Sequence, residues 1–369
     1  MKVAHLFNEI NFSGAEIMYA QAAPLFQMQG YKLIAISTGK NRGNYVTQYE
    51  AANYTICHQP LPSGRFNLIA QFKYYVDFYR YLKREKIAIV HIHKSNLVIS
   101  GVIAWLAKAK CIKTQHNTFK NRWFTLPYAI FWRFMLRKCF KVHFHTIGES
   151  VYLNELNYYK NPSIKINNWF DKERFYPAKE YTEKQVLRKQ LNIAGDKFVI
   201  VSTGSCSHVK NHHDIIKALA LVKNEVNCLY LHLGQGGTEQ EEIQLATELG
   251  VANSIRFLGN QDQVRDYLVA ADLYLMPSKF EGLSIASIEA MACELPCVLY
   301  DAPGLRDLIK HDDNGLLIAP DVQKMADCII SIYQDKAPAL ARAKHALETV
   351  NKEYSMAVSV QKMIDVYKS

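Results

Sequence analysis

Residues 273–290 read LYLMPSKFEGLSIASIEA, and this stretch carries the strongest indication of the fold. Its apolar beginning, Leu273–Met276, predicts a buried strand that stops at a proline. A helix is predicted from about Ser284. Glu281 lies in the loop between them, and Glu289 lies one to two turns into the helix. A strand, a short loop and a helix in this order form the repeating unit of parallel α/β sheets.

The chemistry of this stretch points to a ligand with a charged middle and polar ends. A helix start that follows a glycine offers free backbone N–H groups and the positive end of the helix dipole, which together attract an anion. Carboxylates on either side, here Glu281 and Glu289, can accept hydrogen bonds from hydroxyl groups. Phosphates flanked by two polyols satisfy both features, so the stretch predicts a nucleotide-sugar site.

The same alternation runs through the rest of the chain. The first half has predicted strands at Val3–Phe7, Lys32–Ser37, Ile87–Ile92 and Cys111–Thr114, and predicted helices at Ala15–Gln29 and Phe66–Lys86. The second half has predicted strands at Phe198–Thr203, Cys228–Leu233, Ile255–Leu258, Leu273–Met276 and Cys297–Tyr300, and helices at Asp214–Lys223, Thr238–Leu249 and Val264–Ala270. Both halves therefore predict an α/β fold with a parallel sheet, which makes two Rossmann-like domains.

We expect an N-terminal domain over residues 1–175 and a second domain over residues 176–354. The polar, charged stretch 171–190 is the best linker candidate, and a helix within residues 355–369 is expected to pack back on the first domain. Ligands of open α/β sheets bind at the carboxyl ends of the strands. Two such domains facing each other would enclose a cleft there.

Composition excludes several classes of protein. The chain has 369 residues, of which 49% are hydrophobic and 21% charged, as in ordinary globular proteins. No uncharged apolar run is long enough to span a membrane, and the start has no signal-peptide pattern. Eight cysteines occur without a CxxC pair, which favours free thiols in the cytoplasm.

Charge is unevenly distributed along the chain. Residues 1–180 hold 25 Lys or Arg and 10 Asp or Glu, a net of +15, whereas the remainder has a net of −5. The basic half favours an anionic partner, which could be a phosphate-bearing ligand, nucleic acid or an anionic membrane. Residues 119–144 mix aromatic and basic side chains, as a helix at a membrane interface would. A core-facing helix with a basic solvent face is the alternative.

Three polar residues follow predicted strands, and each also has a simpler structural explanation. Gly14 would let the backbone approach a phosphate at a helix start, or it is only a turn residue. Lys210 could neutralise a diphosphate, or it is a solvated loop lysine. His116 could contact a sugar or a phosphate, or it has a structural role, which is the default for His91 and His93.

No metal site is expected from the sequence. There is no Asp-x-Asp pair and no P-loop signature. The histidines at 208, 212 and 213 have no accompanying carboxylate pattern, and Cys293 and Cys297 have no second cysteine pair.

Taken in order, these motifs resemble the GT-B glycosyltransferases of the large retaining group called family 4. The similarity rests on Ser13-Gly14-Ala15-Glu16, Val90-His91-Ile92-His93, Ile166–Asp171 followed by Phe175 and Pro177, Lys210-Asn211, Phe257-Leu258-Gly259, Ala271-Asp272, Pro277-Ser278 and the Glu281/Glu289 pair. The glutamate pair in its Pro-Ser-x-x-Glu-Gly context is the specific part of the pattern.

The resemblance implies a role for each motif. Glu281 and the backbone of Gly282, Leu283 and Ser284 would hold the donor sugar and diphosphate, and Glu289 would hold the ribose. Lys210 and Gly14 would support the diphosphate, His116 would contact the transferred sugar, and the base would lie near Phe257, Leu258 and Gly259. Glu281, His116 and Lys210 are the residues expected to carry catalysis. The family works without a metal and keeps the anomeric configuration, which requires the leaving-group charge to be stabilised by fixed cations and dipoles.

Three departures from the family pattern affect these roles. Ser205 stands where the family often has an arginine five residues before the loop lysine, so neutralisation of the diphosphate either falls more heavily on Lys210 or is shared with another cation. Asn168-Trp169 replaces Asn-Gly at the entry to the second domain. Asp301-Ala302-Pro303-Gly304 replaces the more usual glycine pair.

The sequence therefore predicts a cytoplasmic glycosyltransferase, for a hexose or an N-acetylhexosamine, that uses a nucleotide sugar and no cofactor or metal. A glycan or lipid-linked acceptor in surface polysaccharide synthesis is expected, with docking on the inner membrane face. Two alternatives remain open. One is a soluble sugar transferase that acts on a small or glucan acceptor. The other is a non-catalytic anion-binding or nucleic-acid-binding protein, for which no recognised motif is present.

Overall fold

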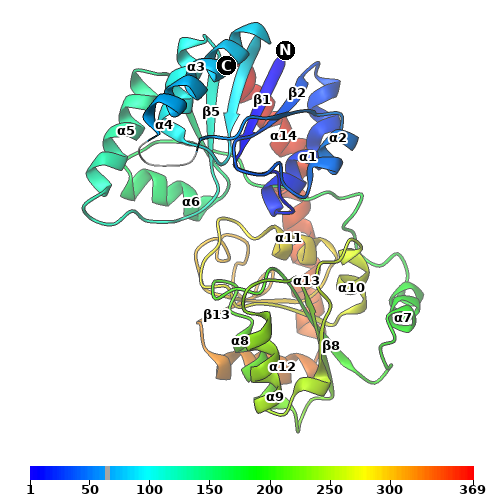
Figure 1. The fold of residues 1–369 in the computed structure, drawn as a ribbon. Coiled ribbons are helices and arrows are strands. Elements are labelled where there is room, and N and C mark those ends of the chain that lie inside the picture. The colour runs from blue at the N-terminus through cyan, green and yellow to red at the C-terminus, as the bar shows by residue number, and fades with distance from the viewer. Residues whose placement is uncertain (63–66) are drawn as a thin grey trace. The chain divides into compact units, whose positions relative to one another are not determined.

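The structure is a computed structural model that describes residues 1–62 and 67–369. The chain divides into two compact units. One comprises Met1–Asn168 together with Met356–Ser369, and the other comprises Trp169–Ser355. Figure 1 shows both as sheets covered by helices. Each is α/β with a parallel sheet, so the predicted fold class is confirmed.

The first unit has a seven-stranded sheet in the order β3-β2-β1-β4-β5-β6-β7. Its strands are β1 Lys2–Phe7, β2 Lys32–Ser37, β3 Thr55–His58, β4 Ile87–Ile92, β5 Lys110–Gln115, β6 His143–Thr146 and β7 Ile164–Lys165. The helices are α1 Gly14–Met28, α2 Val46–Ala51, α3 Leu68–Arg84, α4 Leu97–Leu106, α5 Leu126–Lys138, α6 Glu149–Leu153 and α14 Met356–Lys368, with a π-helical turn at Asn154–Tyr158. Phe66, where the sequence predicted the start of α3, lies outside the described residues.

The two faces of this sheet are chemically different, because successive side chains of a strand point to opposite faces. One face is aliphatic: residues such as Leu6, Val90 and Ile92 form a core with α3, α4 and α5. The other face carries histidines and aromatic rings and packs against α1 and α14, whose Tyr367 hydroxyl lies 2.7 Å from Nδ1 of His91. Figure 1 shows α1 and α14 on one side of the strands and α3 and α4 on the other.

The second unit has a six-stranded parallel sheet in the order β10-β9-β8-β11-β12-β13. Its strands are β8 Phe198–Thr203, β9 Cys228–Leu233, β10 Ile255–Phe257, β11 Leu273–Met276, β12 Cys297–Tyr300 and β13 Leu316–Ile318. The helices are α7 Tyr181–Gln190, α8 His213–Val222, α9 Glu239–Glu248, α10 Val264–Ala270, α11 Ile285–Ala292, α12 Val322–Gln334 and α13 Ala337–Glu353, with a 3₁₀ turn at Ala252–Ser254.

The stretch 171–190, which the sequence indicated as a linker, is part of the second unit. Its helix α7 packs against α10. Two of the basic residues that suggested a solvated linker are paired within the second unit: Lys184 Nζ and Arg188 Nη2 lie 3.1 Å and 2.5 Å from the two carboxylate oxygens of Asp272. Lys184 and Arg188 therefore belong to helix α7, which packs within the second unit and is not a linker.

The two units divide a few residues before the predicted boundary of 175/176. Trp169, Phe170 and Phe175 are all buried. The Phe170 N–H donates to the carbonyl of Tyr354, and Phe170 forms a parallel bridge with Ser355. These contacts make residues 169–175 part of the second unit, while α14 belongs to the first.

Candidate active site

The predicted helix start after Glu281 is present. Helix α11 begins at Ile285, and the side chain of Ser284 caps it by accepting a hydrogen bond from the Ser287 N–H at 3.3 Å. Within the described part of the chain, the backbone N–H groups of residues 282–286 have no protein acceptor. Five consecutive free donors at a helix start form a strong anion-binding surface.

Glu281 is held beside this row of donors. Its backbone N–H donates to the Pro303 carbonyl at 2.8 Å. Gly304, with a φ of +77°, lies so close that a Cβ there would be 2.5 Å from the Glu281 carbonyl oxygen. The glycine in the unusual Asp301–Gly304 segment is therefore required by close packing against Glu281.

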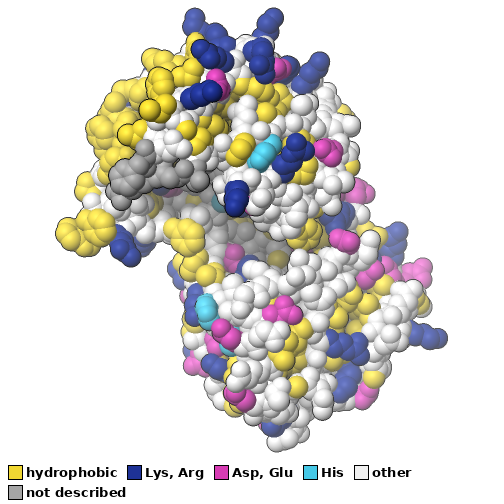
Figure 2. Space-filling view, viewed as in Figure 1, with side chains coloured by type: hydrophobic (Ala, Val, Ile, Leu, Met, Phe, Trp, Pro, Cys, Tyr) yellow, Lys and Arg dark blue, Asp and Glu magenta, His cyan; other side chains and the backbone are white. Residues whose placement is uncertain are grey.

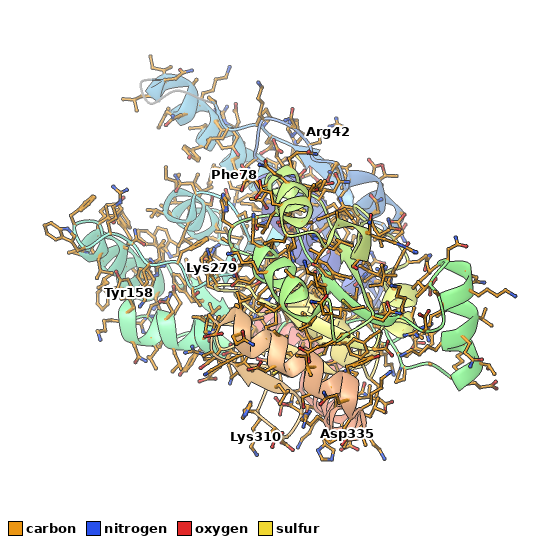
Figure 3. The ribbon with its side chains drawn as sticks, turned by 90° about the horizontal axis from the view of Figure 1, so that it is seen from below. Arg42, Phe78, Tyr158, Lys279, Lys310 and Asp335 are labelled. Carbon is orange, nitrogen blue, oxygen red and sulfur yellow. The ribbon has the colours of Figure 1, made fainter. Side chains whose placement is uncertain are left out.

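Lys210 and Glu281, two of the predicted catalytic residues, form an ion pair. Lys210 Nζ lies 2.6 Å from Glu281 Oε1, and both side chains are largely buried. The two loops that carry them are also joined through the backbone, because the Lys279 N–H donates to the Val209 carbonyl at 2.8 Å. Lys279, labelled in Figure 3, has an exposed side chain. A charge-assisted bond of this kind fixes both groups while leaving their remaining bonding capacity for a ligand.

The loops after β8 and β9 pack backbone against backbone. Gly204 and Gly234 have φ of +155° and +141°, and a Cβ on Gly234 would lie 1.9 Å from the Gly204 carbonyl oxygen. A Cβ on Gly236 would lie 2.2 Å from the Cys206 carbonyl oxygen. No side chain fits between these loops, so glycine is required at both positions. Ser205, which was predicted to bind the nucleotide-sugar donor and stands where the family often has an arginine, is exposed in the loop after β8.

The predicted base-binding segment continues this layer. Phe257 ends β10, and Leu258 donates its N–H to the His232 carbonyl at 2.9 Å. The Gly259 carbonyl accepts from the Gly234 N–H at 2.8 Å. Phe257, Leu258 and Gly259 are each half-buried. The carboxyl ends of β8, β9 and β10 are thus joined into one surface.

Glu289 lies on α11 and is half-buried. Burial raises the pKa of its carboxyl to about 8, and the nearby charge of Arg174 acts in the opposite direction. Among the described residues, no hydrogen bond or ion pair reaches this carboxyl. Burying a carboxyl group without a hydrogen-bond partner costs free energy, and such groups are typical of ligand-binding sites.

Gly14 and His116 belong to the first unit. Gly14 is the exposed first residue of α1, next to Ser13, whose hydroxyl donates to the buried Glu16. Lys94, just after β4, lies 3.2 Å from Glu16. Lys94 and Glu16 had no role in our sequence analysis, although Glu16 is part of the first-loop motif.

His116 lies just beyond the end of β5 and is half-buried. Its Nε2 is 3.2 Å from Nδ1 of His93. Burial, followed by the charges of Lys113 and Lys94, holds the pKa of His116 well below its usual value, so the ring is neutral at physiological pH. His91 has both ring nitrogens bonded, to Tyr367 and to Thr114 at 2.7 and 2.6 Å.

Two buried clusters among the described residues have the composition and spacing of metal ligands. They are His5, His91 and His93 in the first unit, and Cys206, His232 and Glu242 in the second. In the first cluster both nitrogens of His91 are bonded to hydroxyl groups. In the second, His232 Nε2 lies 3.2 Å from the Gly204 carbonyl, and Thr238 bonds Glu242. Because these side chains are already hydrogen-bonded within the protein, we interpret both clusters as structural and not as metal sites.

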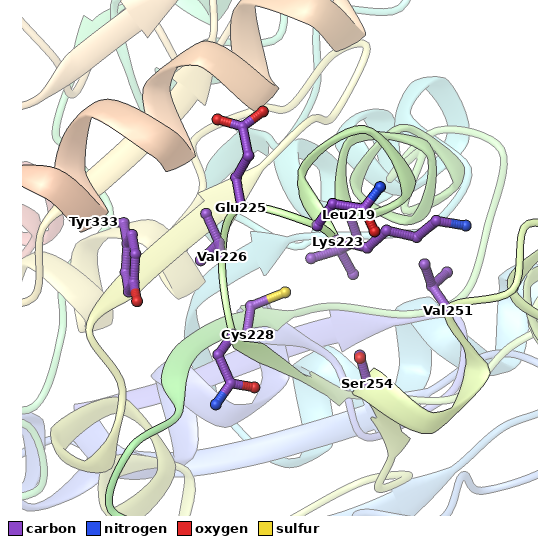
Figure 4. A pocket seen from close by; sticks show the side chains of 10 residues that line it. Leu219, Lys223, Glu225, Val226, Cys228, Val251, Ser254 and Tyr333 are labelled. Carbon is purple, nitrogen blue, oxygen red and sulfur yellow. The ribbon is translucent and has the colours of Figure 1, made fainter.

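Two cavities among the described residues of the second unit lie away from the predicted site residues. One of about 290 Å³ lies at the amino end of β9, and its lining includes Cys228, Val226 and Tyr333 (Figure 4). Another of about 920 Å³ includes Asp272, which directly precedes β11. Ligands of open α/β sheets bind at the opposite, carboxyl ends of the strands. Neither cavity is therefore the predicted donor site.

Comparison with known proteins agrees with the geometry of both units. The family model described as Glycosyltransferase Family 4 matches residues 12–174, and the one described as Glycosyl transferases group 1 matches residues 183–349. The fold is similar to that of HepE from Anabaena, solved in complex with UDP and glucose. Its TM-score is 0.84 at 19% identity, covering 100% of this chain and 99% of that one.

Two curated relatives are similar in sequence. The N-acetyl-alpha-D-glucosaminyl L-malate synthase of Bacillus anthracis is 27% identical over an aligned length of 296, which covers 77% of this chain and 75% of that protein. The UDP-Gal:alpha-D-GlcNAc-diphosphoundecaprenol alpha-1,3-galactosyltransferase of Escherichia coli is 24% identical over an aligned length of 384, which covers 100% of this chain and 96% of that protein.

Fold and sequence together define a glycosyltransferase with the GT-B fold, as the resemblance predicted. More particularly, the chain belongs to glycosyltransferase family 4, the glycosyl transferases group 1.

Replacing Gly234 by alanine tests the packing of the glycine loops. We expect Gly234→Ala to lower the free energy of unfolding by about 2–4 kcal/mol, because of the backbone clash and the positive φ. Gly237→Ala is the matched control in the same loop, since a Cβ there has nothing within 4 Å. Its effect should stay within about 0.5 kcal/mol. Urea unfolding measures both, and equal losses in the two variants would contradict the packing argument.

Proposed function

We propose that the protein transfers a sugar from a nucleotide-sugar donor, bound at the carboxyl ends of the strands of the second unit, with retention of the anomeric configuration. The observation that carries this proposal is the Lys210–Glu281 ion pair beside the free N–H groups of residues 282–286. Fixed positive groups and a hydroxyl acceptor lie side by side there, as transfer from a sugar diphosphate requires.

The leaving diphosphate is the group that needs stabilisation. Lys210 Nζ and the N–H groups of Gly282, Leu283 and Ser284 supply fixed positive charge and dipoles where negative charge develops. Glu281 accepts hydrogen bonds from the hydroxyls of the transferred sugar. In the absence of donor, Lys210 and Glu281 neutralise each other, so each is held in place before the ligand arrives.

The nucleoside end of the donor is bound by the other half of the surface. Glu289 accepts hydrogen bonds from the ribose hydroxyls, and the base lies against Phe257, Leu258 and Gly259. Gly14 supports the diphosphate and His116 contacts the transferred sugar. Ser205 supplies a hydroxyl but no charge. We therefore assign the second cation to Lys279, whose backbone is tied to Val209 next to Lys210.

The relatives favour a UDP-activated hexose or N-acetylhexosamine as donor. HepE was solved with UDP and glucose, and the Escherichia coli relative is named for a UDP-Gal donor and a diphosphoundecaprenol-linked acceptor. No metal is required in the proposed reaction, because Lys210 and the helix start provide the positive charge.

A lipid-linked acceptor fits the surface of the first unit. Aromatic side chains are exposed on and before α5: Phe119, Trp123, Phe124, Tyr128, Phe131 and Phe134. Only Ala129 and Leu136 of α5 are fully buried, so most of its aromatic residues are not used in the core. Basic residues Lys120, Arg122, Arg137 and Lys138 accompany them. Figure 2 shows hydrophobic side chains gathered over this part of the unit.

We propose that this surface, residues 119–138, docks on an anionic membrane where the acceptor is held. Trp123, in the turn before α5, has 84% of its surface exposed, which a segment that faces only water would not favour. No helix in the described part of the chain combines the length and hydrophobicity needed to span a bilayer.

The variant Glu281→Gln tests the catalytic assignment. It removes the charge that holds Lys210 and the sugar, so we expect transfer to fall by about 10²- to 10³-fold with the fold preserved. UDP release from UDP-glucose or UDP-galactose, with a lipid-linked acceptor, measures the rate. Glu248→Gln on the exposed face of α9 is the control and should keep full activity. Undiminished transfer in Glu281→Gln would contradict the proposal.

UDP affinity should depend on pH through Glu289. Its raised pKa means that the free protein holds a protonated carboxyl at pH 7, whereas binding two ribose hydroxyls favours the ionised form. Binding then releases a proton, so UDP should bind more tightly as pH rises, by up to about tenfold per unit below pH 8, and level off above it. Calorimetry measures this dependence.

Two controls isolate the contribution of Glu289. Glu289→Gln and the ligand 2′-deoxy-UDP should both flatten the dependence of affinity on pH between 7 and 8.5. If the slope persists in both controls, another group on the protein or the phosphates of UDP itself is responsible, and the ribose assignment is wrong.

Sedimentation with vesicles tests the membrane surface. The protein should bind vesicles that contain anionic phospholipid, bind neutral phosphatidylcholine vesicles weakly, and dissociate at high salt. The double substitution Trp123→Ala and Phe131→Ala should reduce binding roughly tenfold, since each exposed ring contributes apolar area to the contact. Leu340→Ala, an exposed residue of the second unit, should have no effect. Salt-insensitive or absent binding would refute membrane docking.

A further inference from the structure

Three histidines of the first unit form a continuous hydrogen-bonded chain. His116 Nε2 lies 3.2 Å from His93 Nδ1, and His93 Nε2 lies 3.0 Å from His5 Nδ1. His5 comes from β1 and His93 follows β4, and these strands are neighbours in the sheet. The chain therefore runs from the end of β5 into the buried face between β1 and β4.

The two ends of the chain differ. His5 is fully buried among Tyr19, Phe26 and Tyr54, and its Nε2 has no hydrogen-bond partner among the described residues. His116 is half-buried, and its Nδ1 is the one ring nitrogen at that end not used by the chain. The protonation of the buried ring of His5 is therefore linked through hydrogen bonds to that of the half-buried ring of His116.

All three rings are neutral. Burial is the main cause that lowers the pKa of His5 to about 3, and it lowers those of His93 and His116 well below the usual range. The ammonium of Lys113, which donates to the His93 carbonyl at 2.6 Å, adds to the effect. A neutral imidazole donates from one nitrogen and accepts at the other. Hence the chain has only two arrangements, and all three rings change tautomer together.

The buried end selects between these arrangements. In the first arrangement, His5 Nε2 carries a hydrogen that has no acceptor. In the second, His5 Nε2 carries no hydrogen and has an unused lone pair. A buried N–H without an acceptor is the rarer and costlier defect. The lone pair therefore lies on His5 Nε2, so His5 Nδ1–H donates to His93 Nε2, and His93 Nδ1–H donates to His116 Nε2.

We infer that His5 and His93 are positioning residues that hold His116 in its Nδ1–H tautomer, so that His116 offers a hydrogen-bond donor to an oxygen of the transferred sugar. This inference rests on the proposed contact between His116 and the donor sugar. Which nitrogen of a histidine carries the proton is set by the bond that the other nitrogen makes. Free neutral histidine prefers the opposite tautomer, Nε2–H, so the chain imposes a state that His116 alone would not favour.

Nitrogen-15 spectra of the intact protein with labelled histidine test the inference without reference to activity. Long-range couplings to the ring protons distinguish the two tautomers, and single substitutions assign the signals. We expect Nδ1–H at His5, His93 and His116 between pH 6.5 and 8. Nε2–H at His116 in the unmodified protein would overturn the inference. A spectrum characteristic of metal-bound rings that changes on chelation would also overturn it.

His93→Phe breaks the chain with a ring of similar shape. The His93 ring stacks on Phe7 at a centroid distance of 4.7 Å, a contact that phenylalanine preserves. In this variant His116 should move toward Nε2–H. The kcat with a UDP-sugar donor should fall roughly tenfold, the value of one hydrogen bond made in the transition state, with a smaller change in KM. His143→Phe on β6 is the matched control, because His143 is not one of the three hydrogen-bonded histidines. This variant should change neither the tautomer of His116 nor the kcat.

The outcomes separate this inference from the proposed function. If the tautomers are as expected but His116→Ala leaves sugar transfer unchanged, the three histidines are hydrogen-bonded as inferred, and the proposed contact between His116 and the transferred sugar is wrong. If His116→Ala impairs transfer but His93→Phe leaves both the His116 tautomer and kcat unchanged, the positioning role is refuted while the function stands.

Discussion

Close approach of backbone to backbone is the constraint on which the proposed donor site depends. Gly234 packs on the Gly204 carbonyl, Gly236 on the Cys206 carbonyl, and Gly304 on the carbonyl of Glu281. These contacts bring the loops at the carboxyl ends of the strands together without side chains between them. Polar main-chain groups and the Lys210–Glu281 pair then remain as the chemical content of the surface.

The two units have similar parallel sheets but place their polar groups differently. In the second unit, the site consists of loops beyond the strands, and the strands are mostly apolar, with the buried polar residues Ser202, Thr203 and His232 near the carboxyl ends of β8 and β9. In the first unit, polarity extends into the sheet, where histidines occupy one face beneath α1 and α14. Loops can change charge at little cost to the core, whereas a buried polar layer must be satisfied as a whole.

Sequence reasoning succeeded where burial imposes a simple pattern. Buried parallel strands are continuous apolar runs, so Phe198–Thr203, Cys228–Leu233 and Cys297–Tyr300 were predicted with the observed bounds. It failed where long-range pairing decides: α7 was taken for a linker because its partner Asp272 lies far along the chain. Glu281 and Lys210 were predicted individually, but their ion pair was not. His5 gave no signal, since one histidine in a strand does not show its neighbours across the sheet.

The place of α14 has a consequence for the order of folding during synthesis. This helix completes the first unit, and Tyr367 on it bonds His91 in the centre of the histidine face. Residues 356–368 leave the ribosome only after the whole second unit has been made. The second unit can therefore finish its core first, while the N-terminal sheet, although translated earlier, keeps the part of its histidine face that α14 covers exposed until that helix has been made. A chaperone that shields apolar and aromatic surface would have this face as its target during that interval.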